Sequence, residues 1–149
     1  MAQNPPDNEE SRDLNESERD NLKSQFNHAR DEVTREDVAY VLSKADATAK
    51  RLSDSNQSWV QALGNQAQLL WELLSDWWKD EYEVPWRVVA AITAALLYLV
   101  NPYDLFFDLL PVVGWLDDAV VLKFAYNLVK TDLRAYAIHK GYALEEYGL

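Results

Sequence analysis

Residues 85–124 read PWRVVAAITAALLYLVNPYDLFFDLLPVVGWLDDAVVLKF and form the most apolar part of this 149-residue chain. Pro85 suits the first turn of a helix, and a helix avoids the residue before Pro102. The apolar run between these prolines, interrupted only by Thr93, predicts a helix of roughly 15 residues, or about 22 Å at 1.5 Å rise per residue. A bilayer core is about 30 Å thick, so the pattern favours a buried core helix or one arm of a hairpin dipping into lipid.

The second half of this stretch predicts a short helix and a tight connector. Asn101 is a good N-cap, and Pro102 suits the first helical position. The short helix is expected over residues 103–110, because Pro111 cannot continue it. Gly114 permits a positive φ in the connector that follows.

A long amphipathic helix is predicted over residues 117–139, with Asp117 as its N-cap. Gly141 is a natural stop just beyond the last turn, which leaves residues 142–149 as a short acidic tail. The apolar stripe of this helix is expected to contain Val121, Leu122, Ala125, Leu128, Val129, Leu133 and Tyr136.

An ordered set of aromatic, proline, leucine, glycine and aspartate positions runs through the stretch: Tyr98, Pro102, Asp104, Leu105, Asp108, Pro111, Gly114, Asp117 and Asp118. They resemble the signature of the YkvA-like bacterial domain of unknown function, over about residues 86–129. Phe107 stands where that family usually has a second proline, which predicts a straighter short helix here. The resemblance implies a small α-helical domain, often predicted to be membrane-associated, with no established activity and no catalytic residues to transfer.

Composition excludes several classes of function. The chain has no cysteine, so disulfides, thiolate metal sites and a cysteine nucleophile are ruled out. Its formal net charge of −11 disfavours nucleic acid as a partner, because such binding needs a basic surface. The same charge disfavours simple electrostatic attachment to anionic lipid.

The first part of the chain predicts an arm followed by a helical hairpin. Residues 1–33 are acidic and are expected to be largely disordered, although residues 17–33 have the spacing of an amphipathic helix. Thr34 begins a capped helix that reaches about residue 53. The next helix starts at Ser58 in a capping-box pattern and completes a hairpin over residues 34–84.

The second helix of the hairpin has an apolar seam at alternating three- and four-residue steps: Val60, Leu63, Ala67, Leu70, Leu74 and Trp77. A seam of this length allows either self-association or packing within the hairpin. The short connection between the helices favours the hairpin, since it makes antiparallel neighbours.

Aromatic residues gather just before the apolar stretch, with Lys79 and Arg87 among them: Trp71, Trp77, Trp78, Tyr82 and Trp86. Tryptophan and tyrosine with flanking cations are typical of a membrane–water interface. Aromatic rings also fill space between helices, because each buries a large area. Both interpretations remain open from the sequence.

Four aspartates, at positions 104, 108, 117 and 118, are the one cluster that could carry chemistry. Converging carboxylates could bind a hard cation such as Mg²⁺ or Ca²⁺, or support hydrolysis. Helix capping and ion pairing explain aspartates at these positions without any ligand, and this structural role is the favoured interpretation. We therefore predict no catalytic residue, no cofactor and no metal site.

The sequence as a whole predicts an all-α protein. Its expected parts are a flexible N-terminal arm (1–33), a helical hairpin (34–84), a helix–short helix–long helix unit (85–141) and a tail (142–149). Residues 88–100 and 105–113 are expected to form an apolar wedge that lipid or another chain covers.

The leading functional hypothesis is a non-enzymatic interaction or scaffold module associated with the cytoplasmic side of a membrane. Membrane lipid or a partner protein would contact the residues Trp77, Trp78, Trp86, Tyr103, Phe106, Phe107 and Trp115, with Tyr98 also at the interface. One alternative is a soluble cytoplasmic helical assembly protein, such as a homo-oligomer or a subunit of a complex. The other is a cation-binding or hydrolytic site on the clustered aspartates.

Overall fold

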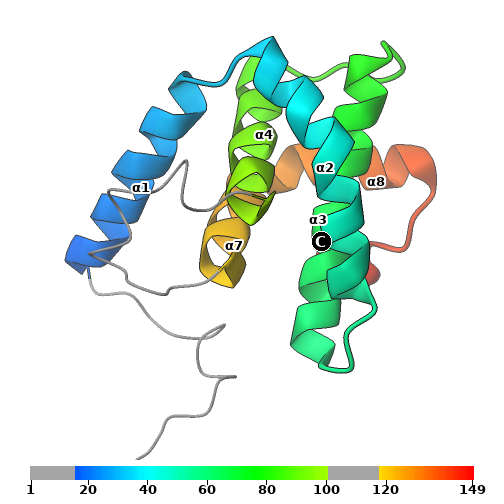
Figure 1. The fold of residues 1–149 in the computed structure, drawn as a ribbon. Coiled ribbons are helices and arrows are strands. Elements are labelled where there is room, and N and C mark those ends of the chain that lie inside the picture. Colours follow the sequence, from blue (N-terminus) through cyan, green and yellow to red (C-terminus); the bar gives the residue numbers. More distant parts are fainter. Residues whose placement is uncertain (1–15, 101–117) are drawn as a thin grey trace, which may run out of the picture.

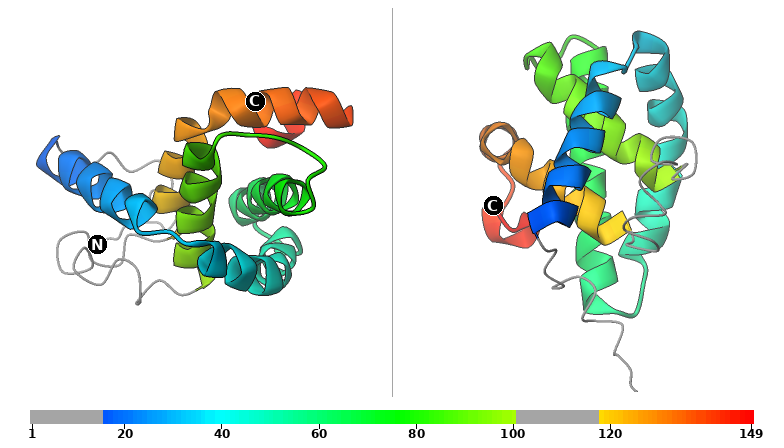
Figure 2. Two further views of the ribbon diagram at one scale, coloured as in Figure 1. Left: turned by 90° about the horizontal axis from the view of Figure 1, so that it is seen from above. Right: turned by 90° about the vertical axis from the view of Figure 1, so that its left-hand side faces the viewer.

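The computed structural model describes residues 16–100 and 118–149, and within these residues the chain forms helices and no strand. Figure 1 shows α4 between α1 on one side and the paired α2 and α3 on the other, and Figure 2 shows the same arrangement from above. The predicted all-α class is confirmed. The helices are α1 (Glu16–Asp31), α2 (Arg35–Ser53), α3 (Ser58–Trp78), α4 (Trp86–Val100), α7 (Asp118–Leu128) and α8 (Lys130–Lys140), followed by the 3-10 turn η2 (Leu144–Tyr147).

The start of α2 is capped as predicted, whereas the start of α3 is not. The hydroxyl of Thr34 accepts the backbone N–H of Asp37 at 3.2 Å, and the Asp37 carboxylate accepts the N–H of Thr34 at 2.9 Å. At α3 the N-cap is Gln57, and its side chain makes no capping hydrogen bond. The predicted capping box on Ser58 is therefore wrong, because Ser58 already lies inside the helix.

The hairpin of α2 and α3 closes at a glycine. An added Cβ at Gly64 would lie 2.7 Å from the carbonyl carbon of Leu52 and 2.8 Å from the carbonyl oxygen of Ala49, and it would also meet the Ser53 nitrogen. The two backbones can approach this closely only because Gly64 has no side chain. Most of the predicted seam of α3 is buried within the chain, as the hairpin interpretation requires.

Two side-chain hydrogen bonds join the helices of the hairpin. The indole N–H of Trp71 donates to the carbonyl oxygen of Leu42 at 3.0 Å, and the amide of Gln68 donates to the Ser53 hydroxyl at 2.8 Å. Trp71 therefore fills space between helices and is not part of an exposed aromatic surface.

Helix α4 is the centre of the fold. It follows Pro85, whose carbonyl oxygen accepts the N–H groups of Val88 and Val89, and its 15 residues agree with the predicted length. Eleven of these residues are buried, and α1, α2, α3 and α7 all contact the helix. The prediction that residues 88–100 form a wedge awaiting lipid or another chain is wrong, because the chain's own helices cover them. The rest of that wedge, residues 105–113, lies outside the described residues.

Helix length also limits how the described part of the chain can meet a membrane. Neither residues 16–100 nor residues 118–149 contain a helix that is both long and apolar enough to reach across a bilayer.

Thr93 is a polar defect in the middle of α4. Its hydroxyl is fully buried and has no hydrogen-bond partner among the described residues. Leaving a buried polar group unpaired costs about 1–3 kcal/mol, and valine has nearly the same shape without the hydroxyl. We expect Thr93→Val to raise the free energy of unfolding by about 1–2 kcal/mol in urea titrations. The exposed Thr131→Val change on α8 should stay within about 0.5 kcal/mol of wild type, and a Thr93→Val variant no more stable than wild type would contradict the prediction.

Helix α1 covers one side of α4. Phe26, Ala29 and Val33 are buried, and the Phe26 ring meets that of Phe124 on α7 edge to face, with 5.5 Å between ring centroids. The amphipathic helix expected over residues 17–33 is therefore present. Assigning the whole of residues 1–33 to a disordered arm is wrong from Glu16 onward, and residues 1–15 lie outside the described residues.

The long helix predicted over residues 117–139 is divided in two. Val129, with φ −110° and ψ 16°, interrupts the helical geometry between α7 and α8. The break lets α7 lie against α4 while α8 lies against α3. Leu128 is 43% exposed, so its predicted place in the apolar stripe is wrong; on a helix it lies well away from the face that buries Leu122, Ala125 and Val129.

The C-terminal residues fold back onto the helices. Gly141 adopts a left-handed conformation (φ 80°) and ends α8 as predicted. The Tyr126 hydroxyl donates to the carbonyl oxygen of Tyr147 at 2.7 Å, and the Gln66 amide donates to the same oxygen at 3.3 Å. Residues 142–149 are thus a docked segment held by hydrogen bonds, which the acidic composition alone did not indicate.

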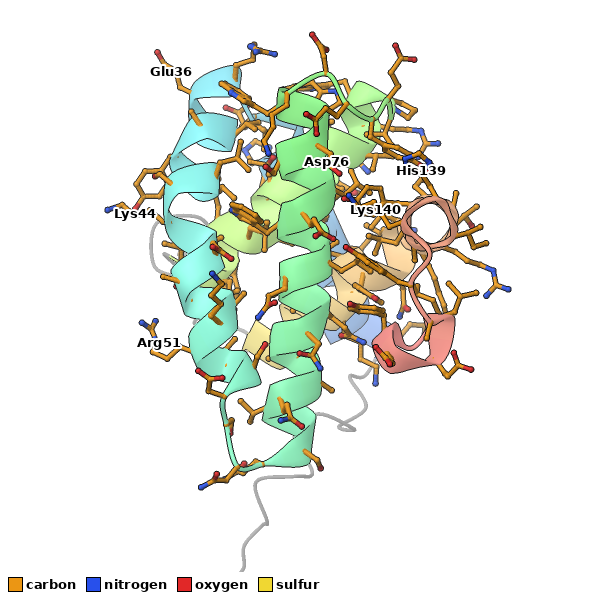
Figure 3. All side chains as sticks on the ribbon, turned by 90° about the vertical axis from the view of Figure 1, so that its right-hand side faces the viewer. Glu36, Lys44, Arg51, Asp76, His139 and Lys140 are labelled. Atoms are coloured by element: carbon orange, nitrogen blue, oxygen red, sulfur yellow. The ribbon has the colours of Figure 1, made fainter. Side chains whose placement is uncertain are left out.

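A polar cluster ties α8 to α3. The Tyr136 hydroxyl, which is buried, donates to the Asp76 carboxylate at 2.6 Å, and the ammonium of Lys140 lies 3.4 Å from the same oxygen. Figure 3 shows Asp76 and Lys140 close together, whereas Lys44 and Arg51 point away from α2. Tyr142 extends the cluster, since its hydroxyl donates to Glu72 at 2.8 Å.

These tyrosines predict alkaline unfolding. Burial and a hydrogen bond to Glu72 raise the pKa of Tyr142 to about 12. Burial also raises the pKa of Tyr126, and burial with the Asp76 hydrogen bond raises that of Tyr136. Between pH 10 and about 12 the folded state therefore holds protons that the unfolded chain has released, so stability present below pH 10 should fall as pH rises.

Urea unfolding at stepped pH, followed by circular dichroism, measures this loss. Each tyrosine that titrates only in the unfolded chain contributes a slope of about 1.4 kcal/mol per pH unit. Tyr126→Phe should reduce the slope. A free energy of unfolding that stays constant from pH 9 to pH 12 would contradict the prediction.

Candidate membrane-contact site

The end of α3, the start of α4 and the start of α2 meet at one end of the bundle, at the top of Figure 1. Helix α3 stops because Asp80 takes a left-handed conformation (φ 62°) and the N–H of Glu81 returns to the carbonyl oxygen of Asp76 at 2.8 Å. This is the hydrogen bond of a Schellman-type helix end. The chain then reaches Pro85 and begins α4 at Trp86.

Three tryptophans converge at this end, which we call the tryptophan end (Trp77, Trp78 and Trp86, with Arg35). The ring centroid of Trp77 lies 6.4 Å from that of Trp78 and 5.9 Å from that of Trp86. Trp77 is half-buried and packs against the core, whereas Trp78 is 38% exposed and Trp86 is 44% exposed. The ring of Trp77, which the core supports, thus holds the exposed rings of Trp78 and Trp86 in place.

Arg35 completes the tryptophan end from α2. Its guanidinium carbon lies 4.6 Å from the ring centroid of Trp78 and 5.5 Å from that of Trp77. A cation over an indole face is attracted by the ring quadrupole, by about 0.5–1 kcal/mol at an exposed position. Arg35 was not predicted as a site residue, because nothing in the local sequence places it beside rings more than 40 positions later.

The rim of the tryptophan end carries both charges. Arg35, Lys79 and Arg87 are exposed, and the exposed acids nearby in the chain are Asp31, Glu32, Glu36, Asp80, Glu81 and Glu83. These nine side chains carry three positive and six negative charges, so the rim is acidic, like the whole chain with its net charge of −11. Contact with a surface here would depend mainly on the aromatic rings.

The structure divides the predicted aromatic cluster. Trp77, Trp78 and Trp86 come together, but Tyr82 packs against α8 instead. Its ring centroid lies 4.9 Å from that of Tyr136 and 5.1 Å from that of His139. Tyr82, like Trp71, fills space between elements. Trp78 and Trp86 are thus exposed, as a membrane–water interface would need, whereas Trp71 and Tyr82 fill space between helices.

Tyr98 does not belong to an exposed interface. It is only 3% exposed and lies 12 residues after Trp86 on α4, or roughly 18 Å away at 1.5 Å per residue. Its predicted interfacial position is wrong, whereas burial agrees with a structural role. The remaining predicted contact residues (Tyr103, Phe106, Phe107 and Trp115) lie outside the described residues.

The predicted motif and the aspartate cluster fall largely in the same undescribed segment. Asn101, Pro102, Asp104, Asp108, Pro111, Gly114 and Asp117 lie within residues 101–117, and Asp118 begins α7. Over residues 16–100 and 118–149, the structure brings no three histidine or acidic side chains together in a way that could hold a metal ion. The roles of the aspartates as caps or as cation ligands remain predictions.

Comparison with known proteins identifies relatives for the part of the chain that runs from α4 into α7. Residues 88–124 match the family described as "Protein of unknown function (DUF1232)". The chain is also 35% identical over 66 residues to the "Uncharacterized membrane protein YkvA" of Bacillus subtilis (strain 168). We call residues 88–124, which match this family, the YkvA-like segment. The resemblance predicted from the motif is thereby confirmed for this segment.

The YkvA-like segment is only part of the fold. The alignment with the Bacillus protein covers 44% of this chain and 62% of that protein, which is less than two thirds of its length. No solved structure matches the chain. Within the described residues, the YkvA-like segment provides α4 from Val88 onward and the first part of α7, and these two helices contact each other at the centre of the bundle.

Proposed function

We propose that this protein is a non-enzymatic helical interaction module that associates with the cytoplasmic side of a membrane through its tryptophan end. The partner is the membrane lipid itself. The observation that carries the proposal is the pair of exposed rings, Trp78 and Trp86, each packed against Trp77, with Arg35 over the ring of Trp78.

Tryptophan is suited to this contact because its ring is apolar while its N–H still needs a polar partner. Such side chains gather where a membrane meets water, with cations next to them. The tryptophan end presents both kinds of group on three helix ends. Because its rim is acidic and the whole chain has a net charge of −11, the contact fits an uncharged lipid surface such as phosphatidylcholine better than an anionic one.

The similarity to the Bacillus protein supports this proposal independently, since the name of that relative describes a membrane protein. The matched segment begins at Val88, two positions after Trp86, and contains the rest of α4. The tryptophan end therefore lies directly before the part of the chain that resembles the family.

Flotation with phosphatidylcholine vesicles tests the proposal. The purified chain should rise with the vesicles in a density gradient, and in cells it should sediment with membranes and be released by carbonate washing, as expected for a surface contact. Recovery of all the protein in the supernatant, with none floating, would overturn the proposal.

A second candidate function is that of a soluble helical assembly protein. A different exposed apolar surface supports it. Leu128 is 43% exposed and Ile138 is 60% exposed, on the adjoining helices α7 and α8. Light scattering after gel filtration distinguishes the two candidates. A discrete oligomer that Ile138→Glu converts to monomers, in a chain that does not float, would favour assembly.

A further inference from the structure

The cover over α4 is uneven. On one side lie α2 and α3, which are joined to each other by the Gly64 contact and by side-chain hydrogen bonds. On another side lies α1, a mostly polar helix whose buried described side chains are Phe26 and Ala29, with Val33 just beyond its end. Helix α1 also lies outside the YkvA-like segment, residues 88–124.

The connection between α1 and α2 lies at the tryptophan end. Only Glu32, Val33 and Thr34 join the two helices, and Thr34 is extended, with φ −119° and ψ 169°. The next residue is Arg35, which lies over the ring of Trp78. A surface that contacts Trp78 would therefore act beside the point about which α1 could swing.

The face of α4 beneath α1 is chemically suited to hydrocarbon. The helix contains valine, alanine, isoleucine and leucine, and its only polar side chains after the first turn are Thr93 and Tyr98. Exposing such a helix to water would be unfavourable, whereas acyl chains would cover it as well as α1 does. Its length of 15 residues, about 22 Å, exceeds one leaflet of roughly 15 Å and falls short of a full span.

We propose that the face of α4 covered by α1 is a second lipid-binding surface, exposed when α1 swings away about residues 32–34 at a phosphatidylcholine surface. This inference rests on the proposed function, because the tryptophan end brings the hinge to the membrane. Trp86, at the first position of α4, would mark the interface, and the rest of the uncovered face would lie against acyl chains.

Single cysteines test the inference cleanly, because the chain has none of its own. Ala29→Cys places a thiol on the buried edge of α1, and Ala67→Cys places a matched thiol in the buried core of α3. The rate of alkylation is measured for each variant with and without phosphatidylcholine vesicles. We expect vesicles to accelerate the reaction of the cysteine at position 29 by about tenfold or more, and to leave that at position 67 unchanged.

Flotation of the same samples separates the possible failures. Protein that floats while the position 29 cysteine remains protected would overturn the inference and leave the proposed function intact. Protein that does not float would overturn both. Acceleration at both positions would show general unfolding and also overturn the inference.

Hydrogen exchange on the wild-type chain gives a second measurement that needs no substitution. Vesicles should increase exchange in Glu16–Asp31 and leave the amides of α2 and α3 protected. Unchanged protection of α1 on vesicles that carry the protein would contradict the swing.

Discussion

The variant Gly64→Val should lose at least about 4 kcal/mol of unfolding free energy, a large part of the roughly 5–15 kcal/mol of a typical domain. Its Cβ would meet three backbone atoms of α2, at Ala49, Leu52 and Ser53. Backbone atoms cannot rotate away as the end of a side chain can, so α2 and α3 must separate. Inserting atoms into a well-filled core already costs about 1–3 kcal/mol, and separation of the helices adds lost burial along the whole seam.

Thermal and urea unfolding measure this effect, and α3 supplies a matched control. Ala62 lies two positions earlier on the same helix and is exposed, so Ala62→Val introduces the same side chain without the contact. It should cost no more than about 0.7 kcal/mol, the helix propensity difference between the two residues. Equal stability of the two variants would show that the hairpin does not depend on close backbone approach.

Removing both exposed rings, as Trp78→Ala with Trp86→Ala, should weaken binding to phosphatidylcholine vesicles by about 30-fold or more. This corresponds to roughly 2 kcal/mol or more, a modest loss for two large aromatic side chains at an interface. Both side chains are partly exposed, so the fold should tolerate the change better than loss of the half-buried Trp77. Quantitative flotation over a range of lipid concentrations gives the ratio.

The double change Leu128→Ala with Ile138→Ala serves as the control for the tryptophan variant. It also removes two exposed apolar side chains, but from α7 and α8. Vesicle binding of this control should equal that of wild type. Equal losses in both double variants would show that any exposed apolar area suffices and that the tryptophan end has no special role.

Local signals in the sequence were sufficient for the helices themselves. The capping box on Thr34 and the position of Pro85 each depend on residues within one turn, and both are found as the pattern indicates. The stop at Gly141 is local in the same way. Such features can be predicted because the groups that satisfy a helix end are close in sequence.

Features that depend on distant contacts were missed. The break at Val129 separates α7, which lies mainly against α4, from α8, which lies against α3, and a continuous apolar stripe does not reveal this change of partner. The burial of α4 was mistaken for an open wedge, since hydropathy gives the apolarity of a helix and not the number of helices around it. Arg35 joined the tryptophan end for a similar reason, through a contact across the fold.

The candidate site was predicted in part. Trp77, Trp78 and Trp86 were singled out by composition, and the structure brings these three together. Composition could not separate them from Trp71 and Tyr82, whose partners are a carbonyl on α2 and a ring on α8. Which aromatic residues remain exposed is decided only when all the helices are in place.

The position of α4 at the centre of the bundle bears on how relatives of this chain should be studied. Residues 88–124 define the similarity, yet α1, α2 and α3 shield the hydrophobic helix that this segment contributes. A fragment trimmed to those boundaries would expose this apolar helix to water, because it would lack the helices that cover it. We expect such a fragment to precipitate or to require detergent. In homologues that keep only the shared region, a neighbouring subunit or lipid would then have to cover the apolar helix.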